Sequence, residues 1–454
     1  MKKIYLLAAS ALLMLAACSS EDVAPSGVAN TNSNAPMAVG FDTYTASTTR
    51  SGEKDVMTTS TLQTTGFGVF AQQAETSYSS SAIMDFMYNQ EVTYSAPSWT
   101  YTPLKYWPNE TEADMHNATG HATSTDKDVV SFFAYAPYVD ATPGSGAVTS
   151  AVITDKDNAA TPADIDNVGI TALTKNTDTG DPKVSYQIAY TPSKSVDLLW
   201  GVAPSGGLNY TAVNNEAISK AEGTPLLSLV KPSKDQKIKF LFKHALARIG
   251  MTVVAAVDQI APGGTLDNNT KIYVNSVTIT DAAATPTIPT KGDLNLNNTT
   301  ANVAKWENTT IGGAIKLVVS GTRSPEANLN PELIGTGSSQ GQPGVTTSEK
   351  NVIKNNKYFM LIPTPGTDAT LDVTINYTVI TNDANVQNTY STTNNVITKR
   401  ITLSSKTGST TGFLNNKAYN LKLILGLTSI KLDAEVADWE VEGDINVDLP
   451  KNQE

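Results

Sequence analysis

Segments in which apolar residues take every second position recur along this chain, and they restrict its fold more than any other feature. The clearest examples are residues 237–243 and 371–377. Successive side chains of a β-strand point to opposite faces, so this period buries one face and leaves the other in water. Stretches with helical periodicity are short, the best being residues 215–222, whereas an α/β fold needs a helix after most strands. The sequence therefore predicts an all-β protein.

The candidate strands are rich in β-branched and aromatic residues and form two groups. The first group is residues 66–72, 91–94, 129–135, 183–190 and 196–202, and the second is residues 237–257, 271–280, 314–320, 358–362, 371–380, 395–404 and 418–427. A stretch containing Gly and Pro, residues 203–235, separates the groups, so we place a domain boundary near residue 230. We expect two antiparallel β-sandwiches in tandem, at 51–230 and 231–427, followed by a C-terminal strand or tail at 428–454.

The N-terminus carries the pattern of an exported lipoprotein. Lys2 and Lys3 precede an apolar stretch, residues 4–17, which ends at the single cysteine of the chain, Cys18. This stretch is shorter than the roughly 20 apolar residues that span a bilayer, and small residues precede the cysteine. We predict a signal peptide at residues 1–17 and lipidation of Cys18. Two or three acyl chains, at about 0.8 kcal/mol per buried CH₂, would anchor the precursor stably in the outer membrane.

Composition limits the partners and the means of stabilisation. The formal net charge is -11, and the sequence contains no basic block, which argues against nucleic acid as a partner. Because no cysteine follows Cys18, the exported part must be held by its core and its sheet hydrogen bonds. From residue 19 to about residue 36 the chain is rich in Ser, Asn, Ala and Pro and has almost nothing large to bury. Residues 18–50 are therefore predicted to hold a flexible tether and, at their end, a strand.

No constellation of catalytic or metal-binding residues stands out. His116 and His121 lie in one polar segment, but a zinc site usually needs four ligands at defined spacing. His244 lies in register with the apolar side of its predicted strand, where a core histidine with a backbone partner is the favoured interpretation. The glycine-rich segment 335–341 lacks the spacing and the lysine of a phosphate-binding loop. We expect no enzyme activity, no cofactor and no metal.

An aromatic cluster leaves a binding role open. Trp99, Tyr101, Tyr106 and Trp107 could stack on sugar rings if they are exposed, or fill a sandwich core if they are buried.

Several short motifs in order along the chain resemble the fimbrillin family of Bacteroidetes surface pilins. They are Val39-Gly40-Phe41-Asp42, Gly66-Phe67-Gly68-Val69-Phe70, Met87-Tyr88-Asn89, Tyr106-Trp107-Pro108, Phe132-Phe133-Ala134-Tyr135-Ala136-Pro137, Val196-Asp197-Leu198-Leu199-Trp200 and Phe242-Lys243-His244-Ala245-Leu246. The resemblance implies two transthyretin-like β-sandwich domains and export as a lipidated precursor. It also implies cleavage by an Arg-specific protease, here between Arg50 and Ser51, which removes the first strand. An extended strand of another subunit then fills the groove that is left.

The residues offer candidates for both strands of such an exchange. Met37, Val39 and Phe41 alternate before Arg50, as a removable strand should. Two alternating sets near the C-terminus could be the donor: Ile430, Leu432, Ala434 and Val436, or Ile445, Val447 and Leu449. Alternatively, the first set is simply the last strand of the second domain.

The resemblance and the aromatic cluster lead to two hypotheses about function. The first is a structural pilus subunit that is cut after Arg50, polymerises with the same or related chains and supports adhesion to a host surface or glycan. A cut site and a C-terminal tail favour a polymerising subunit over an anchor. The alternative is a monomeric, surface-anchored glycan-binding lipoprotein that uses Trp99 and Trp107.

Overall fold

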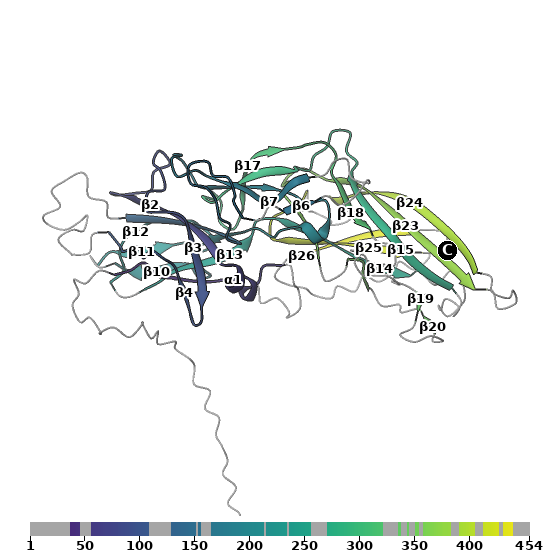
Figure 1. The fold of residues 1–454 in the computed structure, drawn as a ribbon, viewed down its shortest axis with the longest axis horizontal. Coiled ribbons are helices and arrows are strands. Elements are labelled where there is room, and N and C mark those ends of the chain that lie inside the picture. The colour runs from purple at the N-terminus through teal and green to yellow at the C-terminus, as the bar shows by residue number, and fades with distance from the viewer. Residues whose placement is uncertain are drawn as a thin grey trace, which may run out of the picture. The chain divides into compact units, whose positions relative to one another are not determined.

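The computed structural model describes the greater part of the chain after the N-terminal segment. The described residues are 37–45, 56–108, 129–150, 153–155, 165–212, 215–233, 236–255, 270–320, 335–336, 343–344, 350–353, 357–382, 390–404, 412–425 and 430–438. All of them belong to one compact unit, Pro36–Glu454. Strands dominate this part of the chain (Figure 1), which confirms the all-β prediction.

Four sheets form the body of the described structure. The first sheet has the order β1 (Phe41–Thr45), β13 (Ile238–His244), β9 (Leu199–Val202), β5 (Val129–Ala136), β2 (Phe67–Ala74), β3 (Met87–Ser95) and β4 (Ser98–Thr100), with β12 (Leu226–Leu229) also paired to β5. The second has the order β17 (Lys305–Thr310), β16 (Lys291–Asn295), β8 (Lys183–Gln187), β7 (Ile165–Leu173) and β6 (Ile153–Asp155).

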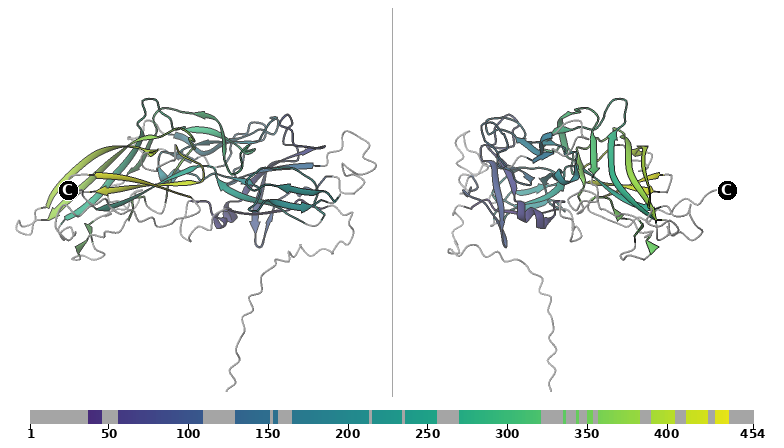
Figure 2. Two further views of the ribbon diagram at one scale, coloured as in Figure 1. Left: turned by 180° about the vertical axis from the view of Figure 1, so that it is seen from behind. Right: turned by 45° about the vertical axis from the view of Figure 1, so that its right-hand side comes forward.

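The other two sheets come from the second half of the chain. One has the order β21 (Lys350–Asn351), β14 (Ala247–Ala255), β25 (Lys417–Leu425) and β26 (Ile430–Asp438), with β22 (Phe359–Leu361) also paired to β14. The other has the order β18 (Lys316–Ser320), β15 (Thr270–Asp281), β23 (Thr370–Asn382) and β24 (Tyr390–Thr402), and its long strands form a curved layer (Figure 2). Two short hairpins complete the strands, β10 (Leu208–Thr211) with β11 (Ala217–Lys220) and β19 (Gly335–Thr336) with β20 (Pro343–Gly344).

The centre of the first sheet is buried on both faces. Every residue of β5 is buried, and Phe132 and Phe133 illustrate why, because they point into different apolar clusters. Phe132 packs with Phe41 and Trp107, whereas Phe133 belongs to a cluster that continues into the second sheet through Tyr186. This explains why the central strands carry an unbroken apolar run instead of the alternation of a half-exposed strand.

Strand pairing does not change at residue 230, where the sequence suggested a boundary. β13 lies beyond that position and pairs with β9, and β16 pairs with β8 over five residue pairs. The predicted single strand 237–257 is also wrong. The chain breaks it into β13 and β14 at Ala245 and Leu246, and the two parts enter different sheets. The apolar pattern runs through this corner because both residues are fully buried.

The described residues include the α-helix α1 (Thr59–Thr65), a short 3₁₀ helix at Pro192–Lys194, and two further helical residues, Leu403 and Ser404. Thr58 and Thr61 form a reciprocal capping box that begins α1, and only Leu62 of the helix is buried. Residues 215–222, the stretch with the best helical periodicity in the sequence, do not form a helix. That segment contains β11, whose hydrogen bonds to β10 satisfy its backbone in a hairpin. In the described residues, no helix combines the length and apolar character needed to cross a membrane.

Candidate functional site

Strand β1 and the residues before it lie at an edge of the first sheet and change partners along their length. Met37 and Val39 bond to the segment that follows β4: the Val39 N–H donates to the Lys105 carbonyl at 2.9 Å, and the Trp107 N–H donates to the Met37 carbonyl at 3.0 Å. From Phe41 onward the partner is β13, in parallel register. The segment is therefore held by main-chain hydrogen bonds to two separate parts of the chain.

Phe41 is the main apolar contact of β1. Its side chain is 1% exposed, and four aromatic rings surround it. Its ring centroid lies 5.4 Å from Tyr101, 6.0 Å from Phe132, 6.1 Å from Phe67 and 6.2 Å from Phe240. We call these four residues the β1 seat. Because they come from β2, β5, β13 and the segment after β4, β1 covers a cluster that joins much of the first sheet.

The inward-facing positions of the strand continue past Phe41. Val39, Phe41, Thr43 and Thr45 are buried, whereas Asp42 and Tyr44 face outward. The buried threonines keep their hydroxyls paired, since the Thr43 Oγ1 donates to the Phe240 carbonyl at 3.1 Å and the Thr45 Oγ1 contacts the Thr59 hydroxyl at 3.0 Å. The alternation expected of Met37, Val39 and Phe41 is seen in the burial of Val39 and Phe41 and continues over four further residues, although the strand itself begins at Phe41.

Tyr101 binds β1 through its hydroxyl as well as its ring. The hydroxyl donates to the Val39 carbonyl at 2.8 Å and accepts from the Lys105 N–H at 3.2 Å. Burial raises the Tyr101 pKa to about 12, although the backbone bond to Lys105 opposes this shift. The phenol therefore stays protonated at physiological pH and remains a donor to the Val39 carbonyl, two residues before β1.

His244 and Asp197 form a buried pair that holds the segment just before α1. His244 Nδ1 lies 2.8 Å from Asp197 Oδ2, and the same oxygen accepts from the Met57 N–H at 2.9 Å. The His244 and Asp197 side chains are 2% and 0% exposed. The core position predicted for His244 is confirmed, and the carboxylate of Asp197 is its partner at Nδ1. The pair fixes Met57, just before α1.

Several predicted site residues lie outside the described residues. These are Cys18, Arg50, Ser51, His116, His121, Ile445, Val447 and Leu449. In sequence, Arg50 falls between the end of β1 at Thr45 and the next described residue, Val56. In the part of the chain that the structure describes, no three His, Cys, Asp or Glu side chains cluster closely enough to hold a metal ion.

The first donor candidate, containing Ile430, Leu432, Ala434 and Val436, forms β26. This strand pairs with β25 in antiparallel register from Ile430↔Leu425 to Asp438↔Lys417. It is the end strand of its sheet as described.

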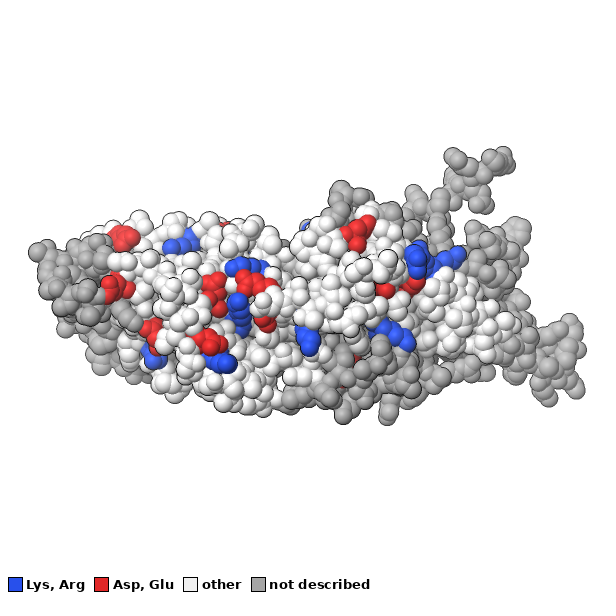
Figure 3. Space-filling view, turned by 90° about the horizontal axis from the view of Figure 1, so that it is seen from above, with Lys and Arg blue, Asp and Glu red and all other residues white. Residues whose placement is uncertain are grey.

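The aromatic cluster at 99–107 fills the core instead of forming a surface. Trp99, Tyr101 and Trp107 are 8%, 7% and 1% exposed, while Tyr106 is 47% exposed. Neither tryptophan presents a ring face to a ligand, so the binding platform on which the glycan hypothesis depended is not formed by these residues. On the face shown in Figure 3, described basic and acidic residues are interspersed.

Sequence reasoning missed the contributions of Thr43, Thr45 and Phe240 to this site. The first two could have been found from the period of two, which continues through threonine, a residue favoured in strands. The role of Phe240 could not, because its contact with Phe41 depends on the parallel pairing of segments almost 200 residues apart.

Comparison with solved structures defines the class of fold. The chain is similar to the crystal structure of a fimbrial protein from Bacteroides vulgatus, with a TM-score of 0.53 and 19% sequence identity, covering 89% of this chain and 99% of that chain. This likeness shows a fold shared with a fimbrial protein.

A comparison of sequences finds a relative that matches nearly the whole chain. The chain is 25% identical to the fimbrium subunit Fim1C of Phocaeicola vulgatus, covering 98% of this chain and 99% of that protein. No model of a known protein family matches. The resemblance to the fimbrillin family is confirmed by these similarities to fimbrial proteins. Both relatives are named as fimbrial proteins, and neither name describes an enzyme.

Proposed function

We propose that this protein is a structural subunit of a surface fimbrium that polymerises by strand exchange at the β1 seat. In this proposal the chain is exported as an outer-membrane lipoprotein through Cys18 and is cut between Arg50 and Ser51 by an Arg-specific protease. The cut frees β1, and a strand from another subunit replaces it. The observation that carries the proposal is the position of β1: an edge strand of apolar and threonine side chains, seated on four aromatic rings and followed within five residues by Arg50.

The bonding of β1 suits a strand that can be exchanged. Its two stretches of main-chain hydrogen bonds, to residues 105–107 and to β13, depend on backbone groups and not on particular side chains. A replacement strand with apolar residues at alternate positions can form the same bonds and fill the same side-chain sites. Specificity would then come from how well its side chains fit beside Phe67, Tyr101, Phe132 and Phe240.

Loss of β1 without replacement is energetically unfavourable. It would expose the edge of β13 and the apolar β1 seat, and removing Val39 and Phe41 from contact forfeits roughly 1.5–3 kcal/mol for each side chain. An open edge beside exposed aromatic rings favours pairing with another chain. This cost supplies the driving force for polymerisation after cleavage.

We assign the donor to the C-terminal tail, in particular Ile445, Val447 and Leu449. The other candidate, β26, is paired with β25 over nine residues, and using it as a donor would break that ladder. The tail, in contrast, offers alternating apolar residues beyond the end of β26. Six residues, 439–444, separate it from β26 and reach about 20 Å when extended, so the tail can extend to a neighbouring subunit.

The sheet pairing supports two tandem transthyretin-like sandwiches with a boundary that differs from residue 230. In this arrangement the first and second sheets form the N-terminal domain, which includes β13, β16 and β17. The third and fourth sheets form the C-terminal domain. The β1 seat lies wholly in the N-terminal domain, as exchange at the groove of that domain requires.

Cleavage and polymerisation are tested together on protein recovered from cells. We expect surface material to begin at Ser51 and to run as a heat-sensitive ladder on gels. The Arg50→Ala variant should remain a lipidated precursor and form no ladder. Lys54→Ala is the matched control, since it removes a nearby cation that an Arg-specific protease does not recognise, and it should behave as wild type. Ladders from Arg50→Ala, or wild-type material that begins at Cys18 and stays monomeric after Arg-specific protease, would overturn the proposal.

A further inference from the structure

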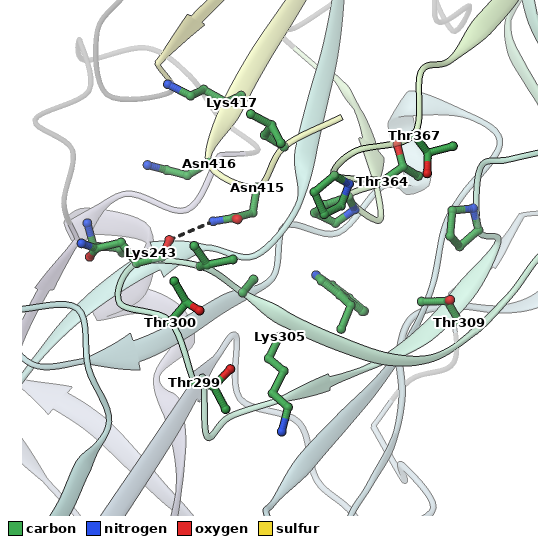
Figure 4. Close-up of a pocket in the computed structure, with 18 of the residues that line it drawn as sticks. Lys243, Thr299, Thr300, Lys305, Thr309, Thr364, Thr367, Asn415, Asn416 and Lys417 are labelled. Atoms are coloured by element: carbon green, nitrogen blue, oxygen red, sulfur yellow. Dashed lines mark hydrogen bonds between the residues drawn. The ribbon is translucent and has the colours of Figure 1, made fainter. Parts of the chain in front are cut away.

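The structure contains a cavity of about 780 Å³ whose lining includes none of the four residues of the β1 seat. It is lined by residues 299–311, which include β17, by the turn at 363–367, and by residues 414–417 at the start of β25 (Figure 4). Its volume falls in the range of about 300–1,000 Å³ that is typical of small-molecule sites. Neither the strand-exchange proposal nor the names of the relatives assign it a role.

Trp306 provides a rigid aromatic surface in this cavity. It is half-buried, and its Nε1–H donates to the Ala245 carbonyl at 3.0 Å. Tyr186 packs edge-on against the indole, with ring centroids 6.2 Å apart and an interplanar angle of 71°. Because one edge of the indole is bonded and packed, its orientation is set before a ligand arrives, which reduces the entropy lost on binding. A fixed indole suits stacking against the apolar face of a sugar ring.

Neutral polar side chains supply the hydrogen-bonding groups that sugar hydroxyls need. Thr299, Thr300 and Thr309 are exposed lining residues from the β16–β17 hairpin region. Across the cavity, the Asn415 side-chain amide donates to the Asn302 carbonyl at 3.3 Å, which joins two of the lining segments (Figure 4). Hydroxyls donate and accept, so this lining can match hydroxyl groups whose orientation varies around a pyranose ring.

The charged lining residues are all cations. Lys243, Lys305 and Lys417 line the cavity, and the lining includes no Asp or Glu. Lys305 is engaged by Glu307 at 3.0 Å, whereas Lys243 forms no ion pair within the described residues. Because Lys305 also lies 3.7 Å from Asp181 and Lys417 has an interaction of its own, Lys243 is the lysine that can attract an anion to this cavity.

We infer that this cavity binds a carboxylated saccharide, with the sugar ring on Trp306 and the carboxylate near Lys243. The acidic sugar has two chemical sources, a hexuronate in a polysaccharide or a terminal sialic acid on a glycan. Both present a ring, hydroxyls and a carboxylate, which are the three groups that this lining matches. The site is independent of strand exchange, so the uncut chain should bind.

Calorimetric titration of the uncut chain, residues 19–454, tests this inference. The probes are tetragalacturonate and 3′-sialyllactose, with neutral maltotetraose for comparison. We expect saturable binding of at least one acidic probe, at least about tenfold tighter than maltotetraose, because a charge-assisted contact is lost with the neutral sugar. Binding of only one acidic probe identifies the source of the ligand.

Two lysine variants separate the site from general charge attraction. Lys243→Glu should abolish binding of the acidic probe, while Lys291→Glu, on the exposed face of β16 and outside the cavity lining, should leave it unchanged. Lys243 is only half-buried, so the thermal midpoint of that variant should stay close to wild type. Three results would overturn the inference. The neutral probe could bind as tightly as the acidic probes, or the two variants could have equal effects. The third is that neither acidic probe binds at about 1 mM, the weakest affinity expected of a site.

Discussion

Replacing Phe41 by alanine should destabilise the intact precursor by about 3–5 kcal/mol. A Phe→Ala change in a core costs about that much, since transfer free energy is lost and a cavity remains. Phe41 meets the conditions for a value in this range, because it is 1% exposed and contacts four rings that belong to separate segments and cannot all close into the space. With a urea m-value of about 2 kcal/mol/M, the unfolding midpoint should fall by about 1.5–2.5 M.

Urea titration of residues 19–454 without lipid, followed by tryptophan fluorescence, measures this change. Trp107 is a suitable reporter because it is buried in the same cluster and lies 5.7 Å from Phe132. The matched control is Tyr44→Ala on the opposite face of the same strand. Tyr44 is 37% exposed and accepts one hydrogen bond from the Ser205 N–H at 3.1 Å, so its loss should cost no more than about 1 kcal/mol.

The same substitution can be followed after cleavage. A peptide of residues 37–50 should bind the cut chain, and its Phe41→Ala form should bind at least about 100-fold more weakly, because 3 kcal/mol corresponds to that ratio. The argument is that contacts in the β1 seat hold the strand. It would be refuted if Phe41→Ala and Tyr44→Ala lowered the free energy of unfolding equally, or if Phe41→Ala lowered it by less than about 1 kcal/mol.

Two further predictions concern buried and partly buried charges. Burial opposes ionisation of Glu307, but hydrogen bonds from Lys183 and Lys305 hold its pKa at about 2, below its ordinary 4.5. The ionised Glu307 therefore stabilises the fold fully above pH 4.5, and this contribution is lost as the pH falls towards 2. The thermal midpoint of the protein should drop between about pH 5 and about pH 2.5, and Glu307→Gln should make that drop smaller. An unchanged drop would contradict this prediction. Asp197→Ala leaves the buried His244 without its carboxylate partner and should lower the free energy of unfolding in urea by about 2–3 kcal/mol. Asp197→Asn should lower it by less. Equal losses of unfolding free energy in the two variants would show that hydrogen bonding at this position does not matter.

The position of the strands could be predicted from the sequence to a large extent. The period of two located β13 and β23, since alternate side chains must face a core and water in any half-buried strand. At residues 215–222 the best helical period of the chain falls in a β-hairpin, so periodicity alone is a poor guide there. It also missed α1, which is begun by the Thr58–Thr61 capping box and buries only Leu62.

The sequence alone did not predict which strands pair with one another. The unbroken apolar run of residues 237–257 does not reveal the corner at Ala245 and Leu246, because a buried corner is as apolar as a buried strand. For the same reason the tryptophans at 99 and 107 were compatible with a core and with a binding surface. Only packing distinguishes the two, since it decides whether other rings cover them.

The sequence by itself determined that this chain is all-β, that an alternating strand precedes Arg50, and that its motifs follow the order of the fimbrillin family. These are local properties, carried by residue spacing. Tertiary structure alone decided that β1 pairs with β13 across nearly 200 residues, that Phe41 meets the rings of the β1 seat, and that Trp306 and Lys243 share a cavity. Such contacts join distant segments, and the free energy of burying them together is a property of the whole fold and of no single segment.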